Sequence, residues 1–324
     1  MKCQAFSSSN WLLKTVLATL VLPCNAIVAE DAKFAERTFS FLYQQFGSFE
    51  LNADRTSIIA VDNSANVGII RDVTTAKRFE VVRVTCADRA VFSSDEKYIF
   101  VSRTDARITV LDAKTLKEIR TIPTDDDPSL HLRVAGNLLA KIGTLGKCSL
   151  YLVGEGGSLK HFATLKNVVA TSRSNGTAKF VFLQTSGVLH SYDPKSLELS
   201  SVPTSATKLP SGLGDWFLST DGRYLFGAHD SVRARLDLTK EKMEWERFLP
   251  NDADRLFDFV GESGTIFGSG GKVCYWDIKT RKVLASKQID DDTILQVFSL
   301  AQPGTFVAAL DNGTVVFFSL NVPK

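Results

Sequence analysis

The sequence has almost no excess of charge of either sign. Its 324 residues include 38 lysines and arginines against 36 aspartates and glutamates, which gives a formal net charge of +2. Proteins that bind the phosphate backbone of nucleic acids need a concentrated basic surface. The composition therefore excludes nucleic acid as an expected partner.

Long apolar runs are also missing. The N-terminal run, residues 15–22, is much shorter than the ~20 residues that span a bilayer. It follows two lysines and precedes the small residues Ala26 and Ala29, which is the pattern of a cleaved signal peptide. We therefore expect residues 1–29 to be a signal peptide and the mature chain to be exported to a periplasm or the medium. No membrane span is expected after cleavage, and an uncleaved anchor helix is the alternative.

Cysteine is scarce, with five in the whole chain. Cleavage of the signal peptide would remove two of them and leave Cys86, Cys148 and Cys274. Because this number is odd, at least one thiol is expected to stay unpaired. A Cys86–Cys148 disulfide stays open as an alternative, since sequence cannot show the close approach that the bond requires. Sparse cysteine in the mature chain favours a bacterial source.

No amphipathic helical pattern follows the signal peptide, and what recurs instead is a β-strand that ends in aspartate and a turn. Such strands end at Asp72, Asp112, Asp193, Asp237 and Asp277. An aspartate in this position can accept hydrogen bonds from the backbone two residues on and fix a tight turn. With equivalent strands near Val153 and Ser319, the spacing is about 41 residues, as in four-stranded propeller blades. The predicted fold class is therefore all-β, a seven-bladed β-propeller of four-stranded antiparallel blades.

The repeats assign residues 30–324 to a single propeller domain. The expected blades cover residues 47–84, 85–124, 125–165, 166–204, 205–249, 250–289 and 290–324. In the second blade, the strands are expected at 90–93, 98–102, 108–112 and 118–122. The seventh unit has only three strands, whereas the strand-like residues 36–46 precede the first unit. We predict that 36–46 pairs with 314–320 and closes the ring, which removes exposed strand edges.

Two segments resemble known propeller repeats. YIFVSRTDARITVLDAKTLKEIRTI, residues 98–122, resembles a YVTN-type repeat, and VCYWD contains the Trp276 and Asp277 pair of WD repeats. The Gly-His pair that opens many WD repeats is absent. The resemblance implies a propeller that binds another protein or peptide, although the same fold also supports unrelated chemistries.

Side chains that could bind a metal or catalyse a reaction are few and scattered. The four histidines fall in three blades, without the short spacing of a metal-binding pair: His131, His161, His190 and His229. We therefore predict no catalytic residues, no metal ligands and no cofactor. Calcium is left open as a weaker alternative, because carboxylate oxygens are its usual ligands.

Aspartates gather in the segments that link successive blades. The predicted contact rim consists of Asp125, Asp126, Asp127, Asp252, Asp254, Asp290, Asp291 and Asp292. If these links share one face of the ring, the rim would bind a protein or peptide partner of basic character through charge complementarity. The alternative interpretation is that aspartate simply suits solvated turns.

The central channel is the other candidate site. The innermost strands are expected to include residues 90–92, 216–218 and 297–298, which are apolar and offer few polar groups to a small ligand. Glu50 and Asp258 are the two carboxylates expected on innermost strands. The sequence thus favours a non-enzymatic protein-binding platform. The alternative is an enzyme or sensor with a small molecule in the channel, as in the lactonases and quinone-dependent dehydrogenases that share this architecture.

Overall fold

Strands and tight turns make up nearly all of the described chain. The computed structural model describes residues 36–42, 46–75, 79–124, 129–172, 179–204, 216–219, 222–229, 232–240, 246–250, 253, 255–260, 264–289 and 294–321. All of them belong to one unit, Phe34–Lys324. The predicted signal peptide, residues 1–29, lies outside the described residues. Within these ranges, no helix has both the length and the apolar character needed to cross a membrane.

Hydrogen bonding groups the strands into seven antiparallel units of four, which we call blades 1 to 7 in chain order. Blade 1 contains β2 (Phe46–Leu51), β3 (Ile58–Asp62), β4 (Asn66–Ile70) and β5 (Phe79–Arg83). Blade 2 contains β6 (Ala87–Phe92), β7 (Tyr98–Arg103), β8 (Arg107–Asp112) and β9 (Glu118–Pro123). Blade 3 contains β10 (Ser129–Ala135), β11 (Leu138–Gly143), β12 (Cys148–Val153), a 3₁₀ turn (Glu155–Gly157) and β13 (Leu159–Leu165).

The remaining blades repeat the same order. Blade 4 contains β14 (Val168–Ser172), β15 (Phe180–Gln184), β16 (Val188–Asp193) and β17 (Glu198–Pro203). Blade 5 contains β18 (Phe217–Leu218), β19 (Tyr224–His229), β20 (Val232–Asp237) and β21 (Glu246–Arg247). Blade 6 contains β22 (Arg255–Val260), β23 (Gly264–Ser269), β24 (Lys272–Asp277) and β25 (Lys282–Gln288). Blade 7 contains β26 (Ile294–Ser299), β27 (Thr305–Leu310), β28 (Thr314–Ser319) and β1 (Arg37–Ser40).

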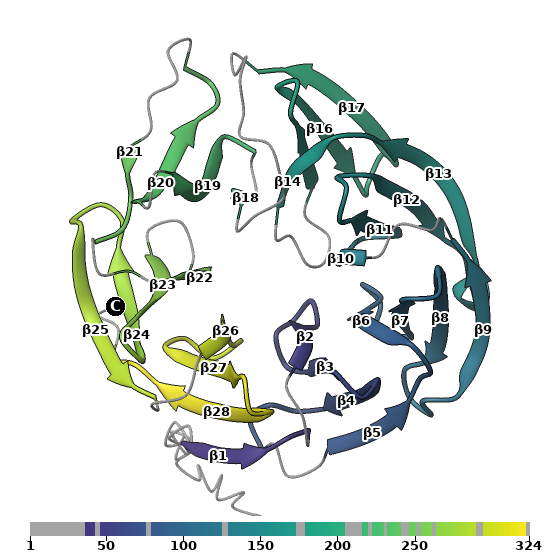
Figure 1. The fold of residues 1–324 in the computed structure, drawn as a ribbon, viewed down its shortest axis with the longest axis horizontal. Helices are drawn as coiled ribbons and strands as arrows, with labels where there is room; N and C mark the ends of the chain where they lie inside the picture. The colour runs from purple at the N-terminus through teal and green to yellow at the C-terminus, as the bar shows by residue number, and fades with distance from the viewer. Residues whose placement is uncertain are drawn as a thin grey trace, which may run out of the picture. The chain divides into compact units, whose positions relative to one another are not determined.

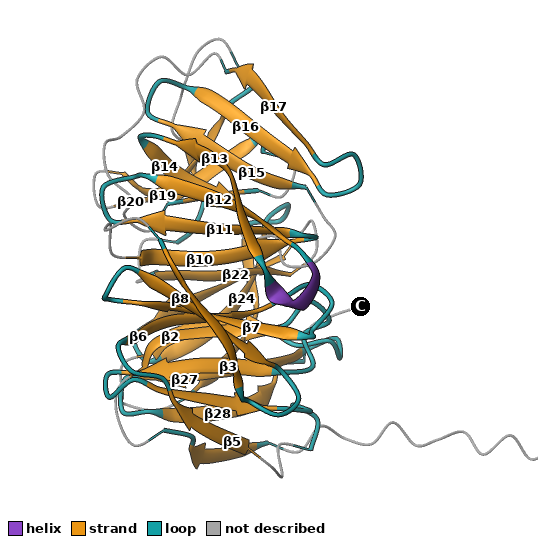
Figure 2. Ribbon diagram, turned by 90° about the vertical axis from the view of Figure 1, so that its right-hand side faces the viewer, coloured by secondary structure: helices purple, strands orange, loops and turns teal. Residues whose placement is uncertain are grey.

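The blades stand around a central space, with the first strand of each blade innermost (Figure 1). The chain is a seven-bladed β-propeller, which confirms the predicted fold class. Between blades 4 and 5, the innermost strands β14 and β18 also pair with each other in parallel. Seen from the side, turns and loops gather along the two faces of the ring (Figure 2).

The core lies between neighbouring blades. All five residues of β3 are buried, whereas those of the outermost strand β5 are exposed or half-buried. An inner strand has a blade against each of its faces, so the apolar residues on both faces are buried away from solvent. Ile59 and Val61 of blade 1, for example, belong to one cluster with Ile99 and Val101 of blade 2.

The N-terminal strand closes the ring as predicted. β1 pairs with β28 from Arg37 opposite Phe317 to Ser40 opposite Thr314, and the two lie side by side in Figure 1. The strand is shorter than the predicted segment 36–46: it ends at Ser40, and Phe46 already begins β2. The next residues, Phe41 and Leu42, are buried and donate their backbone N–H groups to the Gly313 carbonyl.

The repeated aspartates form the expected turns. The Asp112 carboxylate accepts hydrogen bonds from the backbone N–H of Lys114 and Thr115, at 3.1 and 2.7 Å. The Asp277 carboxylate accepts one from the Thr280 backbone at 2.6 Å and a second from its hydroxyl at 2.9 Å. The Thr115 hydroxyl also donates to Asp112, at 2.8 Å, and these hydrogen bonds hold the pKa of each carboxyl below its ordinary value. The aspartate repeat is therefore a structural device of the blade.

None of the three cysteines among the described residues forms a disulfide. Cys148 and Cys274 are buried, and Cys86 is half-buried. The Cys86–Cys148 disulfide left open by the sequence is not formed. A buried cysteine outside a disulfide behaves as a small apolar side chain, which fits the positions of Cys148 and Cys274.

Candidate functional site

A β-bulge recurs near the start of the innermost strands. The register of pairing shifts by one residue in six of them, at Gly47, Asp88, Leu130, Val169, Phe257 and Leu295. The described part of the seventh, β18, has only two residues. A bulge bends its strand and changes the direction of the side chains that follow it.

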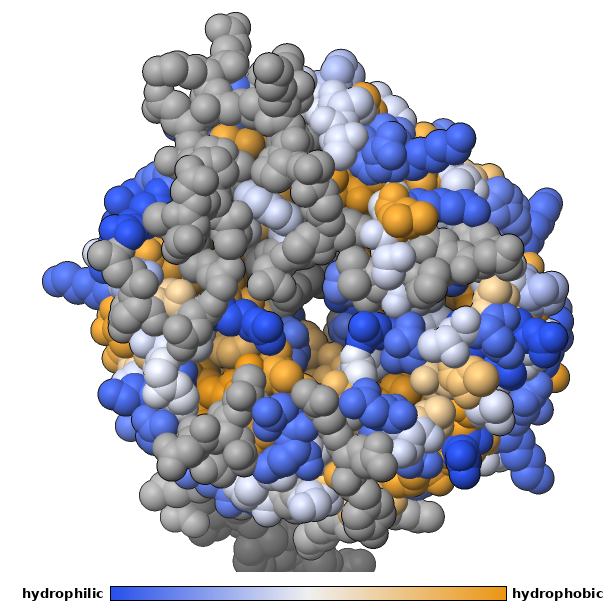
Figure 3. Space-filling view, in the orientation of Figure 1, coloured by the Kyte–Doolittle hydropathy of each residue, from blue (hydrophilic) through white to orange (hydrophobic). Residues whose placement is uncertain are grey.

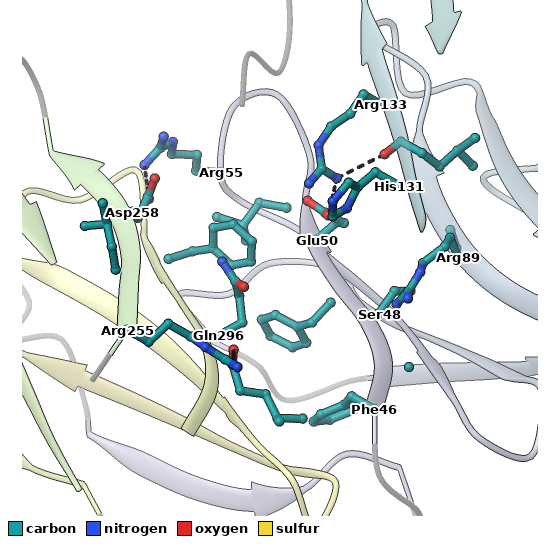
Figure 4. Close-up of a pocket in the computed structure, with 18 residues that line it drawn as sticks. Phe46, Ser48, Glu50, Arg55, Arg89, His131, Arg133, Arg255, Asp258 and Gln296 are labelled. Atoms are coloured by element: carbon teal, nitrogen blue, oxygen red, sulfur yellow. Dashed lines mark hydrogen bonds and ion pairs between the residues drawn. The ribbon is translucent and has the colours of Figure 1, made fainter. Parts of the chain in front are cut away.

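The residue that follows the bulge is polar in five blades, and in all five it lines the same cavity. We call these the post-bulge residues: Ser48, Arg89, His131, Asp258 and Gln296. The cavity has a volume of about 310 Å³ and lies at the channel, between the innermost strands of blades 1, 2, 3, 6 and 7. Figure 4 shows these side chains converging from opposite walls. Figure 3 shows an opening at the centre of the ring with hydrophilic residues beside it.

Two ion pairs cross the cavity between blades that are not neighbours. Arg133 of blade 3 donates to the Glu50 carboxylate of blade 1, and their side chains are 12% and 17% exposed. Arg55, in the turn after β2, reaches Asp258 of blade 6 at 3.3 Å. The same guanidinium donates to the Ser299 carbonyl at 3.1 Å. These pairs connect blade 1 to both sides of the channel (Figure 4).

The other two arginines of the cavity are not matched in this way. Arg255 is exposed and donates to the Leu295 carbonyl at 3.0 Å. Among the residues that the structure describes, Arg89 has one charged contact, 3.9 Å from its Nε to the Asp88 carboxylate. That carboxylate is partly buried, which raises its pKa although Arg89 acts to lower it. Among the described lining residues there are thus four guanidinium groups and two carboxylates. Asp88 stands beside Arg89 and offsets part of this excess.

Part of the cavity wall is aromatic. Phe46, Phe49 and Phe298 line it and are each less than a tenth exposed. The rings of Phe49 and Phe298 are stacked with centroids 6.0 Å apart, and Phe46 tilts against Phe49 at 5.5 Å. Small-molecule sites commonly combine such an apolar wall with a few placed polar groups.

The sequence predictions for the site have different outcomes. The eight aspartates of the predicted rim all lie outside the described residues, so the rim stays a prediction. Glu50 and Asp258 both line the cavity, each beside an arginine that the sequence analysis did not single out. Within the described ranges, no three histidine, cysteine, aspartate or glutamate side chains are grouped as metal ligands would be.

The expectation that innermost strands offer few polar groups was wrong. It placed the inner strand of blade 2 at residues 90–93, whereas β6 starts at Ala87 and includes Arg89. The bulge interrupts the alternation of apolar and polar residues, so the sequence pattern assigns the start of the strand to a loop. One signal could have revealed the positions: a polar residue just before an apolar stretch, recurring at roughly the 40-residue blade period.

Comparison with known proteins identifies the fold and no family. No protein-family model matches this sequence, and no curated protein matches it. Among solved structures, the β-propeller domain of Cps50 (Swd1) from Myceliophteria thermophila is similar, with a TM-score of 0.62 and 14% sequence identity. The match covers 87% of this chain and 99% of that one. At this identity the likeness supports the propeller architecture alone.

Proposed function

We propose that the mature chain is an exported, non-enzymatic binding platform that holds a protein or peptide partner at one mouth of its channel. The observation behind the proposal is the convergence of five post-bulge residues on one cavity. A closed ring keeps these positions fixed relative to one another, and a rigid scaffold with variable loops suits recognition.

The carboxylates of the cavity favour binding over acid–base catalysis. Glu50 and Asp258 each lie against a guanidinium group of another blade. A general acid or base must come within hydrogen-bond reach of a substrate proton, and a guanidinium group held against the carboxylate occupies part of that approach. Here the pairs instead connect non-adjacent blades and fix the walls of the cavity.

Export and the acidic rim enter this proposal from the sequence. The segment 1–29 has the pattern of a signal peptide, and the aspartates between blades would give the partner a second contact through charge complementarity. A basic partner segment on the rim is part of the same proposal.

Affinity capture from the native envelope or extracellular extract tests the proposal. The baits are mature wild type, an Arg89→Gln/Arg255→Gln variant, and a variant with Asp125–127 and Asp290–292 changed to asparagine. Arg83→Gln is the matched control, because Arg83 is an exposed arginine on the outermost strand β5. We expect one partner on wild type and control, and its loss from the channel variant. Retention by the channel variant together with loss from the aspartate variant would place the contact on the rim instead.

The second candidate function is an enzyme or sensor with a small ligand in the channel. The volume of about 310 Å³ lies at the lower end of the ~300–1,000 Å³ usual for ligand pockets. The aromatic wall would cover the apolar part of such a ligand. Capture of no specific protein by any bait would favour this function over the platform.

A further inference from the structure

The cavity has the chemistry of an anion site. Its two carboxylates are each held by an arginine, Glu50 by Arg133 and Asp258 by Arg55. Arg89 and Arg255 have no carboxylate partner among the described lining residues, although the Asp88 carboxylate stands 3.9 Å from Arg89 Nε. The two arginines lie on opposite sides of the cavity (Figure 4). Low-dielectric walls concentrate the field of such charges inside a cleft.

Arg89 and Ser48 are two neighbouring lining residues with unused hydrogen-bonding capacity. Arg89 Nε and Ser48 Oγ are both buried, and neither has a hydrogen-bond partner among the described residues. The two follow equivalent bulges in adjacent blades, and the bulges approach closely: a Cβ on Gly47 would lie 3.6 Å from the Asp88 carbonyl oxygen. Buried polar groups normally have a hydrogen-bond partner. A ligand oxygen bound here would give Arg89 Nε and Ser48 Oγ that partner.

The aromatic wall restricts the kind of anion. Phe46 and Phe49 stand on the same strand as Ser48, and Phe298 stacks on Phe49 from blade 7. A bare inorganic ion would leave this apolar surface unused, whereas an apolar group attached to the anion would cover it. Arginine also pairs with carboxylates through two parallel N–H donors.

We propose that the cavity binds a carboxylate attached to an apolar body, with Arg89 and Ser48 holding the carboxylate and the phenylalanine wall holding the body. Arg255 contributes attraction from the opposite wall. This inference concerns the ligand chemistry of the cavity and holds whether or not the proposed platform binds a protein partner. The carboxylate can come from a free small molecule or from an acidic segment of a partner.

Isothermal titration of the mature protein with N-benzoylglycine tests the inference, with N-benzoylglycinamide as the neutral counterpart. We expect the carboxylate to bind about tenfold or more tightly than the amide, the difference that a charge-assisted hydrogen bond gives. Binding should weaken in high salt, because the screening length falls from about 10 Å at 0.1 M to about 3 Å at 1 M.

Four variants locate the site. Arg89→Gln should abolish the preference for carboxylate over amide, and Arg89→Lys should restore part of it, since the charge returns without the planar fork. Arg255→Gln should weaken binding of the carboxylate severalfold and keep the preference. The control Arg83→Gln, on the outer strand, should bind as wild type. Circular dichroism melts establish that each variant is folded.

A further titration identifies the source of the carboxylate. The blocked peptide acetyl-Phe-Glu-Phe-amide is compared with its glutamine counterpart and competed against N-benzoylglycine. A competing acidic peptide supports the site and points to a partner's acidic segment, whereas binding of N-benzoylglycine alone supports it and points to a free small molecule. Equal binding of carboxylate and amide, or an unchanged preference in Arg89→Gln, would overturn the inference. So would a loss of preference in Arg83→Gln.

Discussion

Replacing Phe41 by alanine is expected to weaken the closure of the ring. Phe41 is only 2% exposed and follows β1, the strand that pairs with β28. Its ring contacts Phe79 edge-on, with centroids 5.9 Å apart, and tilts against Phe46 at 6.1 Å. Truncation of a buried phenylalanine costs about 3–5 kcal/mol, because the contacts are lost and a cavity is left.

The assay is thermal unfolding of residues 30–324 followed by circular dichroism. At this chain length, 1 kcal/mol moves the melting temperature by about 2 °C, so a fall of about 6–10 °C is expected. Thr38→Ala is the control, because Thr38 lies on the same strand with an exposed side chain. If Phe41→Ala melted together with Thr38→Ala and wild type, the N-terminal segment would not be closing the ring.

Two further perturbations follow from the described contacts. Burial acts to raise the pKa of Asp237, but hydrogen bonds from Thr239 and Arg223 outweigh it and lower this pKa to about 2. Because this pKa lies below the ordinary value, the ionised Asp237 stabilises the folded state above about pH 4, and this contribution is lost as the pH falls toward 2. It amounts to at most about 2 kcal/mol. Asp237→Asn should flatten this part of the stability profile in urea unfolding, and an unchanged profile would contradict the assignment. Glu50→Gln should destabilise the fold by about 1–3 kcal/mol, since Arg133 is left without its carboxylate. In the double variant with Arg133→Gln, the two costs should fail to add, whereas strict additivity would show that the pair is not coupled.

The architecture could be predicted from the sequence because its signals are local. Aspartate turns such as those at Asp112 and Asp277 recur at the blade period, and the chemistry of each turn lies within four residues. The missing strand of the seventh blade also pointed to the N-terminal segment. The length of the closing strand was overestimated, because the buried residues Phe41 and Leu42 continue the apolar pattern beyond the last paired residue, Ser40.

The cavity could not be predicted because its residues meet only in three dimensions. Arg89 and His131 reach the same cavity because each follows a bulge and because the ring brings their blades together. A bulge leaves only a weak mark in one sequence, a polar residue before an apolar stretch at the blade period, and the approach of non-adjacent blades leaves none. Glu50 and Asp258 were singled out as carboxylates on inner strands, and their pairing with Arg133 and Arg55 required the folded chain.

Site-directed photo-crosslinking tests most directly whether the channel cavity is the functional site. A benzophenone amino acid is placed at Gln296, which lines the cavity, and in a second protein at Ile119, which is 39% exposed on the outer strand β9. Each protein is irradiated in the native extract, and adducts are analysed by mass spectrometry. The account predicts a specific adduct, with a protein or a small molecule, from position 296 and not from 119. A specific adduct from position 119 alone would contradict it.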